Sequence, residues 1–347
     1  MASLGGEFIT LTDLAKREDP DGKPAEIAET LTQQNAALED MPWVESNMRT
    51  GHQSTIRVGL PTISTRRFNQ GVAPSKSATD QIVDGISMLE GQSFIDVALL
   101  ENSGDPAQTR KEEGSSFVEA MSQKQGELLF YGSEADDNTE YNGFGVRYDT
   151  LDDAQVLDGH AGFMGGDVTT LASIWMVVWA PGKIFGIYPR GSVGGMRHKD
   201  LGEMMVNVDQ GAAAAQDLGT PKMLAHGDQY RWDCGLVCRD RRYVVRIANV
   251  SVLDAKALNN AQDLMEYSTA LQYLMMEAMH LPPSLDGGRA CFYMNRGLAV
   301  AFDKMGMASA NANIYRTEDW NGRMSMSFRG IPIKKMDQLI VGEGVIS

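Results

Sequence analysis

The residues that could support catalysis or metal binding are dispersed along this sequence. The five histidines stand at His52, His160, His198, His226 and His280. They form no His-Glu-x-x-His pattern and no pair at i, i+4 spacing. Cys234 and Cys238 lie in an apolar stretch, and on a strand they would be two side-chain repeats apart, too far for neighbouring zinc ligands. We therefore interpret both cysteines as small buried residues and expect no metal site and no cofactor.

Glycine loops and acidic residues give no stronger indication of catalysis. Gly143-Phe144-Gly145 and Gly191–Gly195 lack the Gly-Lys-Ser/Thr ending of a phosphate-binding loop, and the Gly-x-Ser-x-Gly pattern of hydrolases is absent. Asp149, Asp152 and Asp153 form an acidic loop that could hold a divalent cation weakly, although solvated acids are commoner. An enzyme with an acidic site there is one hypothesis. No residues combine a nucleophile, a base and an oxyanion donor, so we expect no enzymatic activity.

The composition argues against several classes of protein. The chain has 347 residues, with 31 Lys and Arg against 46 Asp and Glu, so its formal net charge is −15. A protein that coats DNA or RNA needs clustered cations, which this balance disfavours. A hydrophobic fraction of 43% supports a folded core, and three cysteines fit a reducing compartment. The start shows no secretory signal, and the longest apolar run, Ile174–Ala180, is too short to cross a bilayer, so we expect no membrane association.

An N-terminal arm and two long helices are expected. Residues 1–50 read as an arm with one helix, whose thin apolar stripe is Ile27, Leu31 and Leu38. Apolar residues then recur every three to four positions over 106–131, and Gly132 is a stop signal. This pattern predicts an exposed helix that acts as a spine. A second long helix is predicted over 260–280.

Residues 49–82 read as a long, basic β-hairpin. Ile56, Val58 and Leu60 alternate with other residues at the period of a strand, and 69–77 is the expected tip. From position 49 to 79 there is no Asp or Glu, and the charged residues are Arg49, Arg57, Arg66, Arg67 and Lys76. A two-stranded ribbon cannot bury its own face. We expect it to contact the acidic body of another copy, with a solvated surface hairpin as the alternative.

Further strands are expected in the second half of the chain. The turn Pro181-Gly182-Lys183 joins strands over 174–179 and 184–188, and a strand pair is predicted over 230–238 and 243–250. Residues 211–218 read as an alanine-rich excursion on the surface. Trp175, Trp179 and Trp232 are interpreted as core residues.

The order of these parts resembles the major capsid proteins of tailed bacteriophages, of a podophage type with the Hong Kong 97-like fold. The segments that carry the resemblance are Leu11–Arg17, Glu39–Trp43, Thr50–His52, Arg57–Thr62, Leu129–Gly132, Gly186–Ser192, His198–Glu203, Tyr243–Asn249 and Phe328–Ile333. The likeness covers nearly the whole chain, and it is the ordered set, not any single motif, that is specific.

The resemblance implies an α+β fold with four regions. They are an N-terminal arm (1–50), an extended loop or E-loop (51–82), a peripheral domain (83–155 and 320–347) with the spine helix (106–131), and an axial domain (156–319). Residues 155–258 separate the two long helices, so a permuted strand order is left open.

The resemblance also implies function and partners. The chain would be a structural protein that self-assembles into pentamers and hexamers of an icosahedral phage head enclosing double-stranded DNA. The alternative is an encapsulin-like compartment shell. Expected partners are other copies, portal, scaffolding and cement or decoration proteins, and packaged DNA only non-specifically. Expected localisation is the virion, assembled in the cytoplasm of a bacterial host.

Residue-level expectations concern contacts between subunits. These contacts are assigned to Arg57, Arg66, Arg67 and Lys76 of the ribbon. Lys76 is also the candidate for a covalent cross-link to an asparagine of a neighbouring subunit.

Overall fold

The chain forms two compact units. The computed structural model describes residues 8–9, 33, 35–159, 170–207, 222–252, 261–307, 314–318 and 324–347. The first unit comprises residues 1–32, 88–124 and 195–233, and the second comprises 33–87, 125–194 and 234–347. None of the described helices is long and apolar enough to cross a membrane.

A seven-stranded sheet forms the core of the second unit, with the strand order β12-β13-β14-β11-β6-β10-β5. Its strands are β5 (Val156–Asp158), β6 (Leu171–Trp179), β10 (Val244–Ser251), β11 (Arg289–Met294), β12 (Ile314–Glu318), β13 (Met324–Phe328) and β14 (Ile331–Lys335). β6 runs antiparallel to β10 and β11, whereas the β11–β14 and β10–β5 pairs are parallel. Every residue of β6 is buried, because both faces of the sheet are covered.

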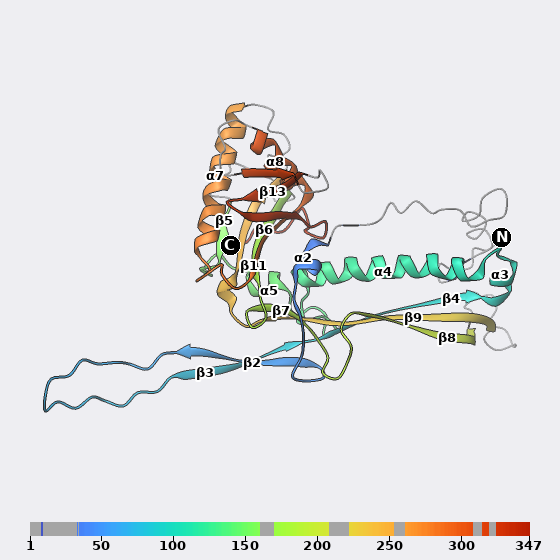
Figure 1. Ribbon diagram of the computed structural model, residues 1–347, viewed down its shortest axis with the longest axis horizontal. Coiled ribbons are helices and arrows are strands. Elements are labelled where there is room, and N and C mark those ends of the chain that lie inside the picture. Colours follow the sequence, from blue (N-terminus) through green and yellow to red (C-terminus); the bar gives the residue numbers. More distant parts are fainter. Residues whose placement is uncertain are drawn as a thin grey trace. The chain divides into compact units, whose positions relative to one another are not determined.

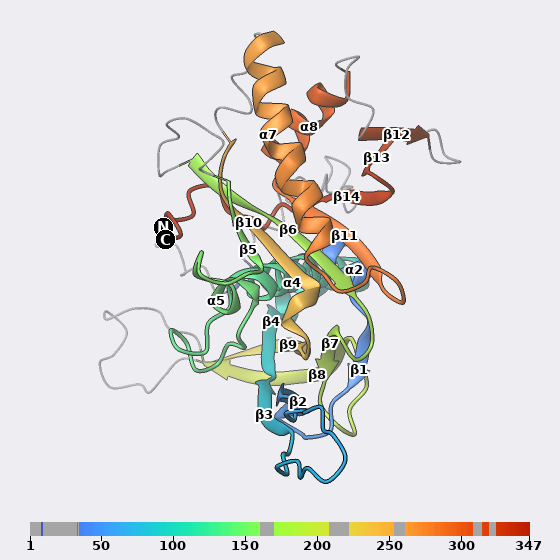
Figure 2. The ribbon, with the colours of Figure 1, turned by 90° about the vertical axis from the view of Figure 1, so that its left-hand side faces the viewer.

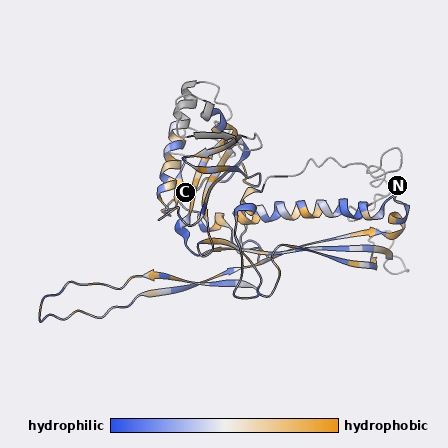
Figure 3. Cartoon of the chain, viewed as in Figure 1, coloured by the Kyte–Doolittle hydropathy of each residue, from blue (hydrophilic) through white to orange (hydrophobic). Residues whose placement is uncertain are grey.

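Helices cover one face of this sheet. α7 (Ala261–His280) and α8 (Arg296–Met307) lie beside it, as Figures 1 and 2 show. Ile174 and Met176 of β6 belong to the same buried cluster as Leu271 and Met275 of α7. Hydrophobic colouring follows the strands of the sheet in Figure 3.

Aromatic rings cover the opposite face, because side chains alternate along a strand. The ring of Trp175 lies 5.8 Å from those of Phe130 and Phe144 and 6.2 Å from that of Tyr148, measured between centroids. Phe144 belongs to the short helix α5 (Phe144–Arg147), and Phe130 to the last turn of α4 (Pro106–Tyr131). All four side chains are buried, so this layer fixes the end of α4 to the sheet.

A smaller sheet in the second unit supports the ribbon. β1 (Trp43–Glu45), which follows α2 (Ala36–Asp40), is parallel to β7 (Ile184–Tyr188). β7 in turn pairs antiparallel with the last residues of β9 (Lys222–Cys238). β2 (Gly51–Gly59) and β3 (Ala78–Gly85) form the ribbon as a separate two-stranded sheet.

The first unit packs α4 on a ribbon of long strands. β9 pairs with β8 (Met196–Asn207) and with β4 (Ser87–Asp96), which leads into α3 (Val97–Asn102). Phe117 of α4 stacks on Tyr230 of β9 at 5.5 Å between ring centroids. A Cβ at Gly114 would lie 2.3 Å from the Tyr230 hydroxyl, which accounts for a glycine inside this helix despite its low helix propensity. Asp105 caps the helix, accepting hydrogen bonds from the amides of Ala107 and Gln108.

Most of the predicted elements are confirmed. The hairpin, the spine helix over 106–131 and the helix ending at residue 280 are present. Cys234, Cys238, Trp175 and Trp179 are buried, whereas Trp232 is only half-buried. Most of the predicted arm and the segment 211–218 lie outside the described residues.

The predicted pairing of residues 230–238 with 243–250 is wrong. These residues form β9 and β10, which belong to different sheets. Between them, Asp240 accepts a hydrogen bond from the amide of Arg242 and caps the 3-10 helix Arg241–Tyr243. β10 is buried along its whole length and pairs with β6 and β5. The pairing of β10 is decided by its neighbours β5 and β6, which lie far from it in the sequence. Local sequence patterns do not reveal such distant partners.

A buried ion pair holds the last residues of the chain to this sheet. The guanidinium of Arg246 donates to the Glu343 carboxylate at 2.8 Å and lies 4.8 Å from the ring centre of Trp175. Tyr131 donates to the other carboxylate oxygen, and Ser173 also bonds to Glu343. Burial and the neighbouring Glu343 raise the pKa of the Tyr131 hydroxyl, so it stays a donor.

We predict that Glu343→Ala lowers the free energy of unfolding by about 3–5 kcal/mol, because it leaves the Arg246 charge buried and unpaired. Denaturant unfolding of the unassembled protein measures this change. Val345→Ala, at a side chain 54% exposed in the same segment, is the control and should stay within about 0.5 kcal/mol of the parent. Equal stabilities of the two variants would contradict the assignment.

Candidate functional site

The ribbon of β2 and β3 is paired only over part of its length. Its register runs from Gly51 opposite Gly85 to Gly59 opposite Ala78, with an irregularity after Arg57. Residues 60–77 continue beyond the ladder without strand pairing, as Figure 1 shows. The backbone groups of this loop are therefore available to another chain.

Few internal contacts shape the loop. The Ser75 hydroxyl donates to the Thr62 carbonyl at 2.8 Å. At the turn, the Gln70 amide donates to the Arg67 carbonyl at 3.2 Å, and Asn69 has a φ of 62°. The turn, at residues 67–70, therefore begins just before the tip predicted at 69–77 and overlaps its first two residues.

Large apolar side chains of the loop are exposed. Leu60 is 79% exposed, Ile63 90% and Phe68 99%. A single exposed apolar residue is ordinary, but three large ones on a loop with no core of its own mark a surface that binds a partner.

The predicted contact residues all lie on this ribbon. Arg57 stands near the outer end of the paired ladder, Arg66 and Arg67 lie at the turn, and Lys76 lies on the returning side of the loop. All four are exposed, and none has an ion-pair partner among the residues that the structure describes. The only side-chain bond found for them there is from Arg66 to the Gln70 carbonyl at 3.3 Å. The structure brings all four onto one ribbon, and their contacts with another subunit stay a prediction.

The base of the ribbon, in contrast, is firmly anchored. Arg147 donates to the buried carboxylate of Asp84 at 2.8 Å. Burial alone would lower the pKa of Arg147, but the charge of Asp84 outweighs it and raises the pKa. The ring of His52 meets that of Phe185 edge-on at 5.7 Å, and burial lowers the pKa of this histidine. A Cβ at Gly235 would lie 2.5 Å from the Gly85 carbonyl oxygen, so the close approach at this base requires glycine.

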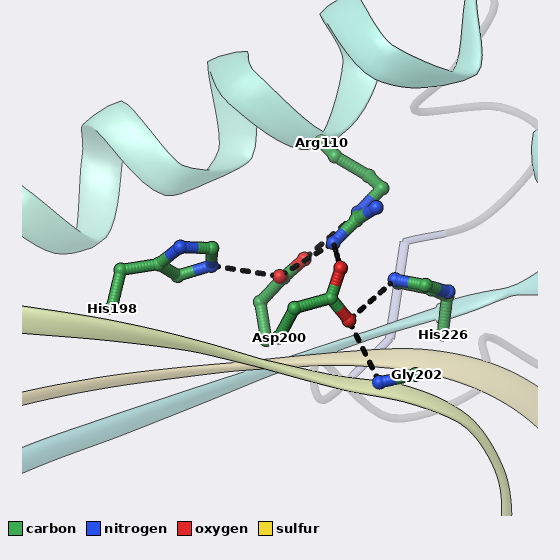
Figure 4. A network of polar contacts seen from close by, with 6 residues as sticks. Arg110, His198, Asp200, Gly202 and His226 are labelled. Carbon is green, nitrogen blue, oxygen red and sulfur yellow. Dashed lines mark hydrogen bonds and ion pairs between the residues drawn. The ribbon is translucent and has the colours of Figure 1, made fainter.

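A second polar cluster, in the first unit, was not found from the sequence (Figure 4). Arg110 of α4 donates to both oxygens of Asp228, at 3.0 and 2.7 Å, and to Asp200 at 2.9 Å. His198 lies 2.8 Å from Asp228, and His226 lies 3.0 Å from Asp200. The hydrogen bond from Arg110 is the main reason that the pKa of Asp200 is lowered, to about 2.

The register of β8 on β9 assembles this cluster. Asp200 pairs with Asp228, and Glu203 pairs with His226, across the ladder. Asp200 and Asp228 are thereby neighbours although they stand 28 positions apart in the sequence. Their spacing along the chain does not predict this proximity. The register of the β8–β9 pair is the information that would have predicted this cluster.

The cluster works as an ion-pair network between α4 and the strands. Ligand atoms of Asp200, His226 and Asp228 lie within 4.8 Å of one another, close enough for a metal. The Arg110 guanidinium, however, already supplies a cation to both carboxylates. A metal would have to displace it. Of the acidic loop at 149–153, Asp153 pairs with Arg241 at 2.7 Å, which also gives that carboxylate a cation.

Comparison with known proteins shows one family and several similar structures. A family model described as "Major capsid protein GP7" matches residues 19–347. A chain of the cryo-EM structure of bacteriophage Epsilon15 has 28% identity and a TM-score of 0.73, and the match covers 100% of this chain and 99% of that chain. No curated protein matches the sequence.

Two more distant structures also match. A chain of the bacteriophage JBD30 capsid has 12% identity and a TM-score of 0.47, covering 96% of this chain and 99% of that one. A chain of an encapsulin complex from Synechococcus elongatus has 9% identity and a TM-score of 0.39, covering 65% and 93%. The family model and the match to the Epsilon15 chain identify the fold as the α+β, Hong Kong 97-like fold expected from the sequence. The permuted strand order stays a prediction.

We predict that Asp228→Asn flattens the loss of stability at acidic pH. Hydrogen bonds from Arg110 and His198 outweigh burial and lower the pKa of Asp228 in the folded protein. The unfolded value is about 3.9, so this pairing stabilises fully above that pH. The stabilisation is lost as the pH falls through the lowered folded pKa.

Denaturant unfolding between about pH 5 and pH 2 measures this slope. Asp286→Asn, at an exposed residue of the second unit, is the matched control and should leave the slope unchanged. A slope for Asp228→Asn as steep as that of the parent would show that the cluster does not act in this way.

Proposed function

The chain belongs to the major capsid protein GP7 family, and from this membership we propose that it builds an icosahedral phage head of pentamers and hexamers around double-stranded DNA. It is a major capsid protein of the tailed-phage type, a structural protein of the virion. The observation that carries the proposal is the ribbon, with exposed Leu60, Ile63 and Phe68 that the described part of the chain does not cover.

The ribbon is proposed to be the E-loop, lying on a neighbouring subunit. Its net charge of +5 over residues 49–79 contrasts with −15 for the whole chain, which favours an acidic partner surface. Contacts that join different surfaces of identical subunits close into rings, as pentamers and hexamers require. Arg57, Arg66, Arg67 and Lys76 are the proposed contact residues, and Lys76 the proposed cross-link site.

The same proposal assigns regions and partners. Residues 1–50 are the arm and 51–82 the E-loop. Residues 83–155 with 320–347 are the peripheral domain, and 156–319 the axial domain. The proposal also includes portal, scaffolding and cement or decoration proteins as partners, together with non-specific contact with DNA. It further includes assembly in the cytoplasm of a bacterial host and the absence of enzymatic activity. No observation favours the encapsulin-like alternative, and nucleic acid inside purified particles separates the two.

We predict that the purified protein forms closed particles in electron micrographs and that Phe68→Ser suppresses them. The side chain is fully exposed in the single chain, so its loss leaves the unfolding free energy of the unassembled protein unchanged. Burial of one phenylalanine per contact is worth about 1.5–3 kcal/mol, so the concentration needed for assembly rises about 10- to 150-fold.

Light scattering against protein concentration measures this threshold. Thr65→Ala, in the same exposed loop, is the control and should assemble as the parent does. Absence of particles for the parent protein under all assembly conditions would overturn the proposed function. An unchanged threshold concentration for Phe68→Ser would show that the ribbon does not contribute to assembly.

A further inference from the structure

A basic groove lies between the outer half of the β2–β3 ladder and the turn after β9. Residues 55–60 and Ile82 of the ribbon form one wall, and Gly182 with residues 238–242 forms the other. The groove has a volume of about 630 Å³. Four arginines and one aspartate line it: Arg57, Arg239, Asp240, Arg241 and Arg242.

Two of these arginines are already paired and two are not. Arg242 binds Asp240 at 2.8 Å, and Arg241 binds Asp153 at 2.7 Å. Arg57 and Arg239 are exposed and have no ion-pair partner among the described residues. The groove therefore already accepts carboxylates from its own chain and presents two more guanidinium groups, which suit further carboxylates.

The same unit carries an exposed acidic loop over residues 133–140. It contains four acids and no cation: Glu134, Asp136, Asp137 and Glu140. Residues 134–139 are all exposed, and the loop is held by its own hydrogen bonds, from the amide of Asp137 to the Ser133 carbonyl at 3.0 Å and from that of Glu140 to the Asp137 carbonyl at 2.9 Å. A loop that is ordered before binding loses little entropy when it docks.

Other acidic segments of the described chain are less suited to this role. The acids of α4 alternate with Arg110, Lys111 and Lys124, and Asp153 is already bound by Arg241. Among the described acidic segments, the loop 133–140 therefore suits the groove best. It has several neighbouring acids with no cation between them, and residues 134–139 are all exposed.

We propose that the basic groove of one copy receives the acidic loop 133–140 of a second copy, with Arg57 and Arg239 bound to Glu134 and Asp136. This inference rests on the proposed function, since it supplies a contact between shell subunits. Groove and loop occupy different places on the same unit, so the contact is heterologous and repeats around a ring. It differs from a contact of the ribbon tip, because Arg66 and Arg67 take no part.

A charge exchange tests the pairing. The groove variant combines Arg57→Glu with Arg239→Glu, and the loop variant combines Glu134→Arg with Asp136→Arg. We expect each variant to lower the yield of particles at least about tenfold, and the four-substitution protein to restore it to within about threefold of the parent. Electron microscopy and light scattering measure the yield.

Controls separate this inference from general effects of charge. Lys111→Glu with Lys335→Glu changes the net charge as the groove variant does, at two exposed lysines, and should assemble as the parent does. Thermal unfolding of each unassembled variant checks that it folds; if a reversal impairs folding, Arg57→Gln with Arg239→Gln replaces it and should still lower the yield.

The outcomes distinguish the two claims. If the parent protein forms particles but the four-substitution protein does not regain assembly, the inference is overturned and the proposed function stands. Normal assembly of either variant would overturn it as well. If the parent protein forms no particles at all, the proposed function itself fails.

Discussion

The loop at the end of the β2–β3 ribbon cannot bury its own apolar side chains. Two strands have one layer and no second layer to pack against, and residues 60–77 do not even continue the ladder. Phe68 and Ile63 therefore stay exposed in the single chain. Burial of these two side chains, which removes them from water, can therefore stabilise only a complex with another molecule. The shape of the ribbon thus favours association. The exposed cations on the same loop favour the acidic partner surface that we propose.

The rest of the second unit supplies the stiffness that such a ribbon needs. The buried pair of Asp84 and Arg147 fixes the base of the ribbon to the rest of the second unit. That body is a sheet with helices on one face and aromatic rings on the other, and Glu343 pairs the buried Arg246 from the end of the chain. An anchored base and an uncovered tip suit a subunit that must fit several neighbours in a closed shell.

Much of this organisation could be predicted from local sequence. The period of apolar residues predicted the spine helix, and alternation with the absence of acids predicted the basic ribbon. The interpretation of Cys234 and Cys238 as buried residues is confirmed. Prediction failed where pairing depends on distant residues. The strands on either side of Asp240 read as a local pair, but β10 is stabilised by β6 and β5 in another sheet.

The polar clusters show the same limit. The network of Arg110 with Asp200 and Asp228 depends on the register of β8 and β9 and on the helix that packs on them. The predicted site residues are consecutive parts of one ribbon, so their proximity followed from the hairpin alone. The contacts proposed for them involve a second chain, so no local pattern within this sequence specifies them.

Hydrogen–deuterium exchange of the amides in residues 60–77, compared between unassembled protein and purified particles, tests the central claim most directly. The account predicts fast exchange in the single chain and strong protection in particles, with little change for the buried amides of β6. Protection of this loop already present in the single chain would contradict it, because the ribbon would then be satisfied without a neighbour.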